Sequence, residues 1–346
     1  MRYLAGQIFD GCGFYEGYLG VERGVISEIG DGAPPDRAVL TGIIVPAFID
    51  CHTHVADASV RMSLDLSLEE LVAPPEGLKH RALRNMGYDE LRLSIHKGMN
   101  MMAKAGTSRF LDFREGGFEG VKALLSCRGP PYPFTLGRPA RQKYNEEEVD
   151  RILDYAEGIG VSAISDWDYT ELESLAEHVH RRGKVFALHA SESRREDLDK
   201  ILALEPKFLV HMSNATDRDL HRCADECIPV IVCPRSNLFM GIVPPLKRMV
   251  EACVEIGLGT DNFMNNDGDM RAEIETAARL LRSQGANPAL ALDAAFRLPR
   301  KLLNLKSELP FRTGEALELV VFDHHNADPM CDLLFRSGNG KRMVCI

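Results

Sequence analysis

Eight apolar runs, each ending in polar or charged residues, constrain the fold of this chain more than any other feature. In chain order they occupy residues 42–54, 106–115, 132–139, 160–166, 184–192, 206–214, 229–237 and 253–262. Runs of this kind are typical of parallel strands that are buried on both faces of a sheet. Helix-like segments lie between most of them, and strands that alternate with helices indicate an α/β fold. We therefore expect a (β/α)8 barrel of the TIM type.

The segments between the predicted strands show patterns that are typical of helices and, in one case, of a lid. In residues 170–182, Thr170 and Glu173 match a capping box, and apolar residues recur at helical spacing. Residues 216–227 show a similar amphipathic pattern. Residues 56–104 are too long for a simple connection between the first two strands, so we expect a lid or a substrate wall there.

The two ends of the chain lack this alternation of strand and helix. They contain short alternating runs with turn signals, such as VERGVISEIGDG and ALELVVFD. We expect the ends to pair into a small β-sandwich domain of residues 1–45 and 316–346, while the barrel occupies residues 46–315. A GNG sequence at 338–340 predicts a hairpin turn.

Composition narrows the class of protein. With 346 residues, 45% of them hydrophobic, the chain can bury a large core. A net charge of −10 argues against nucleic acid as a partner, because phosphate binding needs a basic surface. No apolar run approaches the ~20 residues that span a bilayer, so we expect no membrane association. The start of the chain shows no secretion signal, and the nine scattered cysteines are typical of reduced thiols, which together indicate a cytoplasmic protein.

Histidines and an aspartate stand at the ends of four predicted strands. His52 and His54 end the first strand, His189 the fifth, His211 the sixth and Asp261 the eighth. In a barrel these ends share one face, and residues two apart on a strand point to the same side. A single histidine there is usually only a polar terminus, but a set of five residues is hard to assign to chance. Imidazoles with one carboxylate suit Zn²⁺ or Fe²⁺, and an incomplete shell leaves a position for water, as in catalytic sites.

Several short motifs, in this order, resemble the amidohydrolase superfamily. They are FIDCHTH, LHASE, LVHMSN, CPRSN and GTDNFMNND. The likeness covers nearly the whole chain and is strongest to the mononuclear deaminase branch, which holds S-adenosylhomocysteine, methylthioadenosine, guanine and cytosine deaminases and related chlorohydrolases. It implies that His52, His54, His189 and Asp261 hold the metal, which agrees with the selection made from strand ends.

The end of the fourth strand bears on the number of metal ions. Two-metal members of the superfamily usually bridge their ions with a carboxylated lysine at this place, and this chain has AISDWD there, without a lysine. We therefore expect one divalent ion per chain, Zn²⁺, with Fe²⁺ as the alternative. Asp166 in this motif is open to two interpretations, a polar wall of the pocket or a cap of the following helix.

Glu192 follows the predicted ligand His189 in the motif HASE. The resemblance implies that Glu192 is the proton shuttle of a deaminase; a solvated glutamate at a helix start is the alternative. In that chemistry Asp261 accepts a proton from the attacking water, and His211 hydrogen-bonds to the attacking oxygen. Glu192 protonates the ring nitrogen beside the carbon that loses ammonia. We expect hydrolytic deamination of an aminated heterocycle, such as a purine, pyrimidine, pterin or nucleoside.

Three arginines, Arg114, Arg138 and Arg235, also stand at strand ends. A guanidinium donates two hydrogen bonds at once to a carboxylate or phosphate, so we expect a substrate with an anionic substituent. The alternative is that each arginine pairs with a nearby carboxylate, such as Asp112, Glu115 or one in the loop after the eighth strand.

Other interpretations stay open beside this one. Polar side chains near the last two strand ends are weaker candidates for substrate contacts: Ser236, Asn237, Asn265 and Asn266. A rival function is hydrolysis of a cyclic amide, an imidazolone-like ring or a halogenated heterocycle. A second rival is a barrel without activity that serves as a scaffold, although such a protein is expected to lose its metal ligands. We expect a small heterocyclic molecule as partner, and the sequence leaves open whether the chain forms a homo-oligomer.

Overall fold

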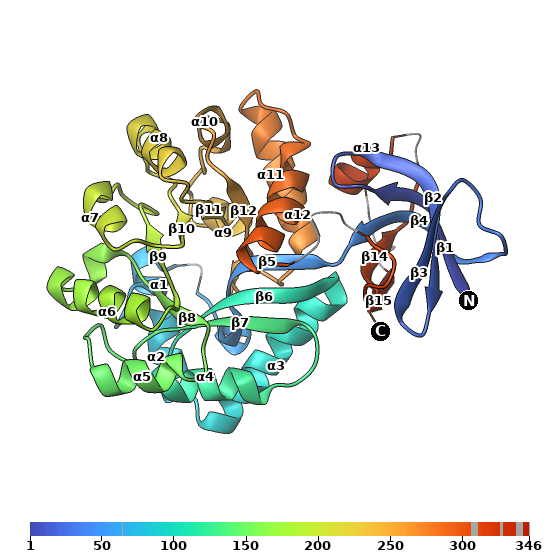
Figure 1. Cartoon of the computed structure of the whole chain (residues 1–346). Coiled ribbons are helices and arrows are strands. Elements are labelled where there is room, and N and C mark those ends of the chain that lie inside the picture. Colours follow the sequence, from blue (N-terminus) through green and yellow to red (C-terminus); the bar gives the residue numbers. More distant parts are fainter. Residues whose placement is uncertain (64, 306–310, 326–327, 337–341, 346) are drawn as a thin grey trace. The chain divides into compact units, whose positions relative to one another are not determined.

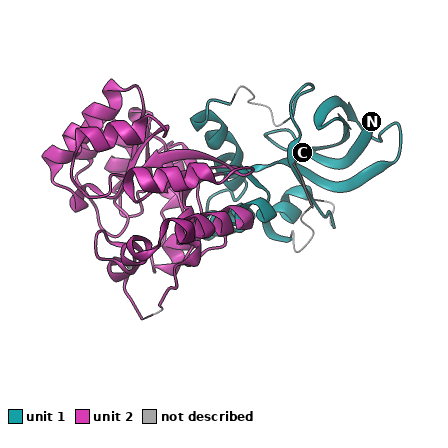
Figure 2. Ribbon diagram, turned by 90° about the horizontal axis from the view of Figure 1, so that it is seen from below, with its two compact units in different colours: residues 1–49, 102–108, 269–346 teal, residues 50–101, 109–268 magenta. Residues whose placement is uncertain are grey.

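The computed structural model describes all residues except 64, 306–310, 326–327, 337–341 and 346 (Figure 1). The chain divides into two compact units, one of residues 1–49, 102–108 and 269–346, the other of residues 50–101 and 109–268 (Figure 2). The domain boundaries expected from the sequence stay a prediction. The turn predicted at 338–340 lies outside the described residues.

A nine-stranded parallel sheet contains the predicted strands, in the order β12-β11-β10-β9-β8-β7-β6-β5-β13. The strands are β5 (Phe48–His54), β6 (Thr107–Arg114), β7 (Tyr132–Gly137), β8 (Gly158–Val161), β9 (Val185–Ala190), β10 (Phe208–His211), β11 (Val230–Val232), β12 (Ile256–Leu258) and β13 (Asp261–Asn262). β13 pairs in parallel with β5, and only Gly259 and Thr260 separate β13 from β12. A short stretch of chain therefore joins the two ends of the strand order, which is consistent with the predicted TIM-type barrel.

Burial explains why these strands could be found in the sequence. Every residue of β5, β8 and β10 is buried. A strand covered on both faces is apolar along its length, and polar residues follow where it leaves the core. Two details differ from the prediction. The run at 42–54 is split at Ala47 between two sheets, and residues 164–166 form the 3-10 turn η2 instead of the end of β8.

Helices follow most of the strands. They are α1 (Leu68–Val72), α2 (Leu78–Asn85), α3 (Tyr88–Ala105), α4 (Gly117–Ser126), α5 (Glu146–Leu153), α6 (Tyr169–Arg181), α7 (Leu198–Ala203), α8 (Asp217–Asp225), α9 (Pro234–Phe239), α10 (Leu246–Glu251), α11 (Met270–Ser283), α12 (Leu290–Leu302) and α13 (Pro329–Cys331). The capping box expected at Thr170 was wrong, because the side chain of Asp168 accepts hydrogen bonds from the N–H groups of Thr170 and Glu171. None of the described helices combines the length and the apolar character that crossing a membrane requires.

A six-stranded sheet, in the order β15-β14-β4-β1-β2-β3, brings together both ends of the chain. Its strands are β1 (Arg2–Phe9), β2 (Phe14–Glu22), β3 (Val25–Asp31), β4 (Ala38–Pro46), β14 (Glu318–Phe322) and β15 (Arg342–Cys345). Alternate residues of these strands, among them Leu4, Ile8, Leu19, Ile44 and Leu319, form one buried apolar cluster. The sheet confirms that the chain ends pair, whereas a sandwich of two packed sheets stays a prediction.

Candidate metal and catalytic site

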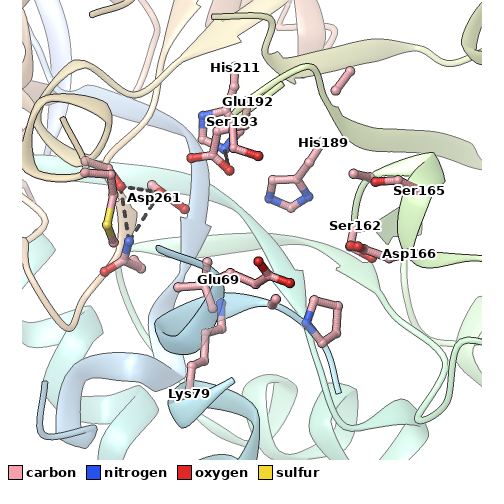
Figure 3. Close-up of a pocket in the computed structure, with 18 of the residues that line it drawn as sticks. Glu69, Lys79, Ser162, Ser165, Asp166, His189, Glu192, Ser193, His211 and Asp261 are labelled. Atoms are coloured by element: carbon pink, nitrogen blue, oxygen red, sulfur yellow. Dashed lines mark hydrogen bonds and ion pairs between the residues drawn. The ribbon is translucent and has the colours of Figure 1, made fainter. Parts of the chain in front are cut away.

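A pocket of about 390 Å³ lies at the carboxyl ends of the parallel strands. Side chains at the ends of β5, β9 and β10 line it, together with the connecting segments that follow the strands. Figure 3 shows Glu192 and His211 on one side of this pocket, and Glu69 and Lys79 across from them. Pockets of ~300–1,000 Å³ are the size that small organic ligands occupy in proteins.

The five residues selected from strand ends come together in this pocket. His52, His189, His211 and Asp261 each offer a donor atom within 4.8 Å of the others. Nε2 of His189 lies 3.2 Å from Nε2 of His52 and 3.4 Å from Nε2 of His54. Oδ1 of Asp261 lies 3.4 Å from Nε2 of His52 and 3.7 Å from Nε2 of His54. Four imidazoles and one carboxylate therefore converge on one small volume.

Whether a cation fits between these histidines depends on which ring nitrogen of each carries the proton. Nδ1 of His189 lies 2.8 Å from the carbonyl oxygen of Val161, and Nδ1 of His54 lies 3.1 Å from that of Phe113. A carbonyl oxygen only accepts, so each Nδ1 carries the proton and each Nε2 presents a lone pair. Burial lowers the pKa of His54 to about 3 and that of His189 well below its usual value, so both rings are neutral. Lone pairs that face one another beside a carboxylate fit a divalent cation between them.

Asp261 is held in place by neighbours of its own. Its Oδ2 accepts a hydrogen bond of 2.5 Å from Oγ of Ser236 and one of 3.3 Å from Nδ2 of Asn262. These bonds leave Oδ1 directed toward the histidines. The backbones of Asp261 and His211 lie in the left-handed region, at φ of 63° and 75°. Such strain costs ~1–3 kcal/mol for a residue other than glycine and tends to persist at functional sites.

Glu192 and His211 form a second cluster beside the converging donors. Oε2 of Glu192 lies 3.5 Å from Nε2 of His211. Nδ2 of Asn237 lies 3.2 Å from Nδ1 of His211 and 3.5 Å from Oε1 of Glu192. Because the amide nitrogen donates, Nδ1 of His211 accepts, and Nε2 carries the proton in the neutral ring. Burial raises the pKa of Glu192, which favours the protonated form of its carboxyl group.

Two of the three arginines are paired away from the pocket walls that the structure describes. Arg114 is fully buried, and its guanidinium lies 3.3 Å from Oδ2 of Asp112 and 2.6 Å from Oε2 of Glu115. Arg235 lies 2.9 Å from Oδ1 of Asp267 in the loop after β13. At both positions the structure shows the carboxylate pairing that was the alternative to substrate contact.

Arg138 is different, because it lines the pocket. Its side chain is buried, with only 6% of the residue exposed, and its Nε donates a hydrogen bond of 3.3 Å to the carbonyl of Gly160. Nη2 is buried and has no hydrogen-bond partner among the described residues. Nη1 lies 4.0 Å from Oε1 of Glu115, whereas Nη2 is a donor at the pocket wall without an acceptor in the part of the chain that the structure describes.

Sequence reasoning identified the other parts of the pocket only in part. Residues 67–80 supply a wall, in line with the lid or substrate wall predicted in this segment: Ser67, Glu69, Val72, Ala73, Pro74, Lys79 and His80. Asp166 lines the pocket, whereas the helix cap is Asp168, so the first of its two interpretations holds. Ser162 and Met240 were not identified, although each closely follows a strand or helix end, which is the available signal.

Comparison with known proteins places this chain. The amidohydrolase family model matches residues 43–344. A protein of Archaeoglobus fulgidus, provisionally named an aminohydrolase, is 33% identical over 301 residues, which cover 86% of this chain and 84% of that protein. The 5-methylthioadenosine/S-adenosylhomocysteine deaminase of Pyrococcus furiosus is 26% identical over 83% of this chain and 77% of the relative. An adenosine deaminase of Xanthomonas campestris with bound zinc shares the fold, with a TM-score of 0.75 at 17% identity over 99% of this chain and 91% of that one. The chain therefore belongs to the amidohydrolase family and is a hydrolase that acts on carbon–nitrogen bonds.

Proposed function

We propose that this chain catalyses the hydrolytic deamination of an aminated heterocycle, namely a purine, pyrimidine, pterin or nucleoside-like ring. The observation that carries the proposal is the pair of Glu192 and His211, 3.5 Å apart, beside the converging imidazoles and Asp261. A relative named as a 5-methylthioadenosine/S-adenosylhomocysteine deaminase and a zinc-containing adenosine deaminase of the same fold support it. One divalent ion per chain, Zn²⁺ before Fe²⁺, is part of the proposal.

His52, His54, His189 and Asp261 would hold the ion. When bound, it supplies a Lewis acid that lowers the pKa of water toward ~7. The protein's own groups then move the protons. Asp261 accepts a proton from the attacking water, because its carboxylate lies among the donors and is oriented by Ser236.

Two further groups act on the substrate side of the pocket. His211 donates its Nε2–H to the attacking oxygen, since Asn237 occupies its other nitrogen. This donor stabilises the charge that develops on that oxygen. Glu192, whose pKa is raised by burial, gives its proton to the ring nitrogen next to the amino-bearing carbon. Deamination needs such an acid, and simple attack by water does not.

An anionic substituent on the substrate also belongs to the proposal. Arg138 is its best candidate partner, because Nη2 lies at the pocket wall without an acceptor among the described residues. Arg114 and Arg235 are weaker candidates since carboxylates already pair with them. Asn265 keeps a buried side-chain amide without a described partner, and it stays a candidate. Asn237 acts on substrate through His211 and Glu192.

Ammonia release by zinc-loaded protein tests this function. The panel holds amino-purines, amino-pyrimidines, pterins and their nucleosides, each with and without a carboxylate or phosphate, and Glu192→Gln is assayed alongside. We expect ammonia from the wild type and a large loss in the variant. Absence of ammonia across the panel, with one ion bound per chain, would refute deamination and favour hydrolysis of a cyclic amide or halogenated ring.

A further inference from the structure

His54 has a second neighbour at Nδ1 besides the carbonyl of Phe113. Oε1 of Glu115, the residue directly after β6, lies 2.7 Å from this nitrogen, and both side chains are buried. A carboxylate at the outer nitrogen of a metal-binding imidazole fixes the tautomer and orientation of the ring. Loss of such a partner typically weakens metal binding about 10–100-fold.

The same carboxylate oxygen reaches a helix in the wall opposite the strand ends. Oε1 of Glu115 lies 2.8 Å from Nζ of Lys79 on α2, and this Nζ lies 3.1 Å from Oδ2 of Asp57. Lys79 is 3% exposed. Although burial alone would lower it, the pKa of Lys79 is raised, because both carboxylates favour the charged ammonium. A lysine from a short helix therefore enters a buried ionic cluster.

The other oxygen of Glu115 is already occupied. Oε2 lies 2.6 Å from Nη2 of Arg114, which is itself fixed by Asp112. Oε1 is therefore the oxygen shared by His54 and Lys79, with Nη1 of Arg138 farther away at 4.0 Å. Oε1 of Glu115 therefore links Lys79 on α2 to His54, which is a proposed metal ligand.

We infer that Glu115 and Lys79 are positioning residues, which hold the His54 ring in its metal-binding orientation and make metal affinity depend on the docking of α2. The inference rests on the proposed metal site. Undocking of Lys79 removes the nearest cation from Oε1 of Glu115, so docking of Lys79 favours the aligned position of Glu115. Residues of α1 and α2 also line the pocket. The contact of Lys79 with Glu115 therefore connects the wall that would enclose a substrate to the His54 ring that would bind the ion.

Zinc affinity in the absence of substrate tests the inference, measured by competition with a chromogenic chelator. We expect Glu115→Gln and Lys79→Met to bind zinc about 10–100-fold more weakly than the wild type. Lys79→Arg should recover most of the affinity, since it keeps a positive charge at the carboxylates. The matched control is Arg84→Met on the same helix, whose guanidinium contacts Glu76 and the carbonyl of Pro75 and is half exposed. This control should retain the wild-type affinity.

Thermodynamic linkage between zinc binding and the docking of α2 gives a second measurement, which would not change if Lys79 had only a structural role. If docking of α2 strengthens zinc binding, zinc must strengthen docking by the same factor. Zinc should therefore slow proteolytic cleavage within residues 65–86 in the wild type and in Lys79→Arg, but not in Lys79→Met.

The outcomes separate this inference from the proposed site. Wild-type zinc affinity in folded Lys79→Met and Glu115→Gln overturns the inference and leaves the metal site standing. Lower melting temperatures with unchanged zinc affinity also overturn it, because they reveal a structural role only. A wild type that binds no zinc overturns the metal site itself, and the inference with it. If Lys79→Met does not fold, Glu115→Gln and the proteolysis of Lys79→Arg decide.

Discussion

The two walls of the pocket are ordered by different forces. At the strand ends, His54 and His189 are fixed by backbone carbonyls of neighbouring strands and by their places in a hydrogen-bonded sheet. The wall of residues 67–80 rests on the five-residue helix α1 and the eight-residue helix α2, and its buried charged contact to the strand-end side is Lys79. Substitutions at the strand ends should therefore change the chemical step, the ion directly or the choice of substrate. Substitutions in the other wall should act indirectly, through the affinity for zinc and for substrate.

The largest effect is expected at Glu192, on the strand-end side. Glu192→Gln removes the acid but keeps the size of the side chain, so kcat should fall about 10²–10⁴-fold. Zinc content and KM should stay close to those of the wild type, which steady-state kinetics and metal analysis can measure. A variant with lowered zinc content instead would show that Glu192 supports the ion and would blur the contrast between the walls.

The second largest effect is expected at Arg138, because this residue should distinguish anionic from neutral substrates. Arg138→Met removes the unpartnered Nη2, and a hydrogen bond from a charged group is worth about 1.5–3 kcal/mol. We expect kcat/KM to fall about 10–100-fold for carboxylated or phosphorylated substrates and little for neutral ones. Arg235→Met is the control, since Asp267 already pairs with that arginine. Equal losses for charged and neutral substrates would contradict an anion contact.

Gly259 tests how tightly the strand-end wall is built. A Cβ at this position would lie 2.7 Å from Cβ of His52 and 2.8 Å from its backbone nitrogen, so β5 would have to shift. Gly259→Ala should lower the free energy of unfolding by about 1–3 kcal/mol and also weaken zinc binding. Gly87→Ala, beside α2, is the matched control because its Cβ would meet nothing within 4 Å. Urea unfolding of both variants gives the comparison.

The smallest effect concerns Asp219, which ties α8 to the loop that carries Glu192. Its carboxylate caps α8 through Thr216 and pairs with Arg195 at 2.7 Å. Burial raises the pKa of Asp219, but these hydrogen bonds outweigh it and lower the pKa to about 2. The stabilisation is thus complete above the unfolded-state pKa near ~4 and is lost as the pH falls through about 2.

Asp219→Asn should accordingly cost about 1–2 kcal/mol of unfolding free energy at neutral pH. The difference from the wild type should shrink as the pH falls from about 4 to about 2. Thermal unfolding across this pH range measures it. A difference that is independent of pH would show that the charge of Asp219 is not what stabilises the helix.

The contrast between the walls also explains what the sequence could predict. A strand buried on both faces stays apolar until it leaves the core, so His52, His54 and His189 stand out at strand ends. Periodicity carries no such signal for α1 and α2, which are too short for a repeating stripe. The contact of Lys79 with Glu115 joins two segments far apart in the chain, and no local pattern encodes it.

Side-chain direction was a second limit. Asp261 and His211 could be selected by type and place, but their positive φ values aim them into the pocket, and residue type alone does not predict such a conformation. The arginines show the same limit in another form. Arg114 lies between Asp112 and Glu115 in the sequence, and that neighbourhood predicted its pairing as well as its type predicted a substrate contact.

The pairing of β13 with β5 has a consequence for the order of folding. His52 and Asp261 lie on strands from opposite ends of the sheet's sequence, so the proposed ligand set does not exist until the last strand has met the first. A nascent chain that still lacks β13 holds an incomplete set of the proposed ligands, because Asp261 is absent from it. Contacts this distant in sequence form slowly. On the proposed ligand set, the complete site for a divalent ion exists only in the finished protein, where zinc would add about 2.7 kcal/mol of stability at a free concentration ~100 times its Kd.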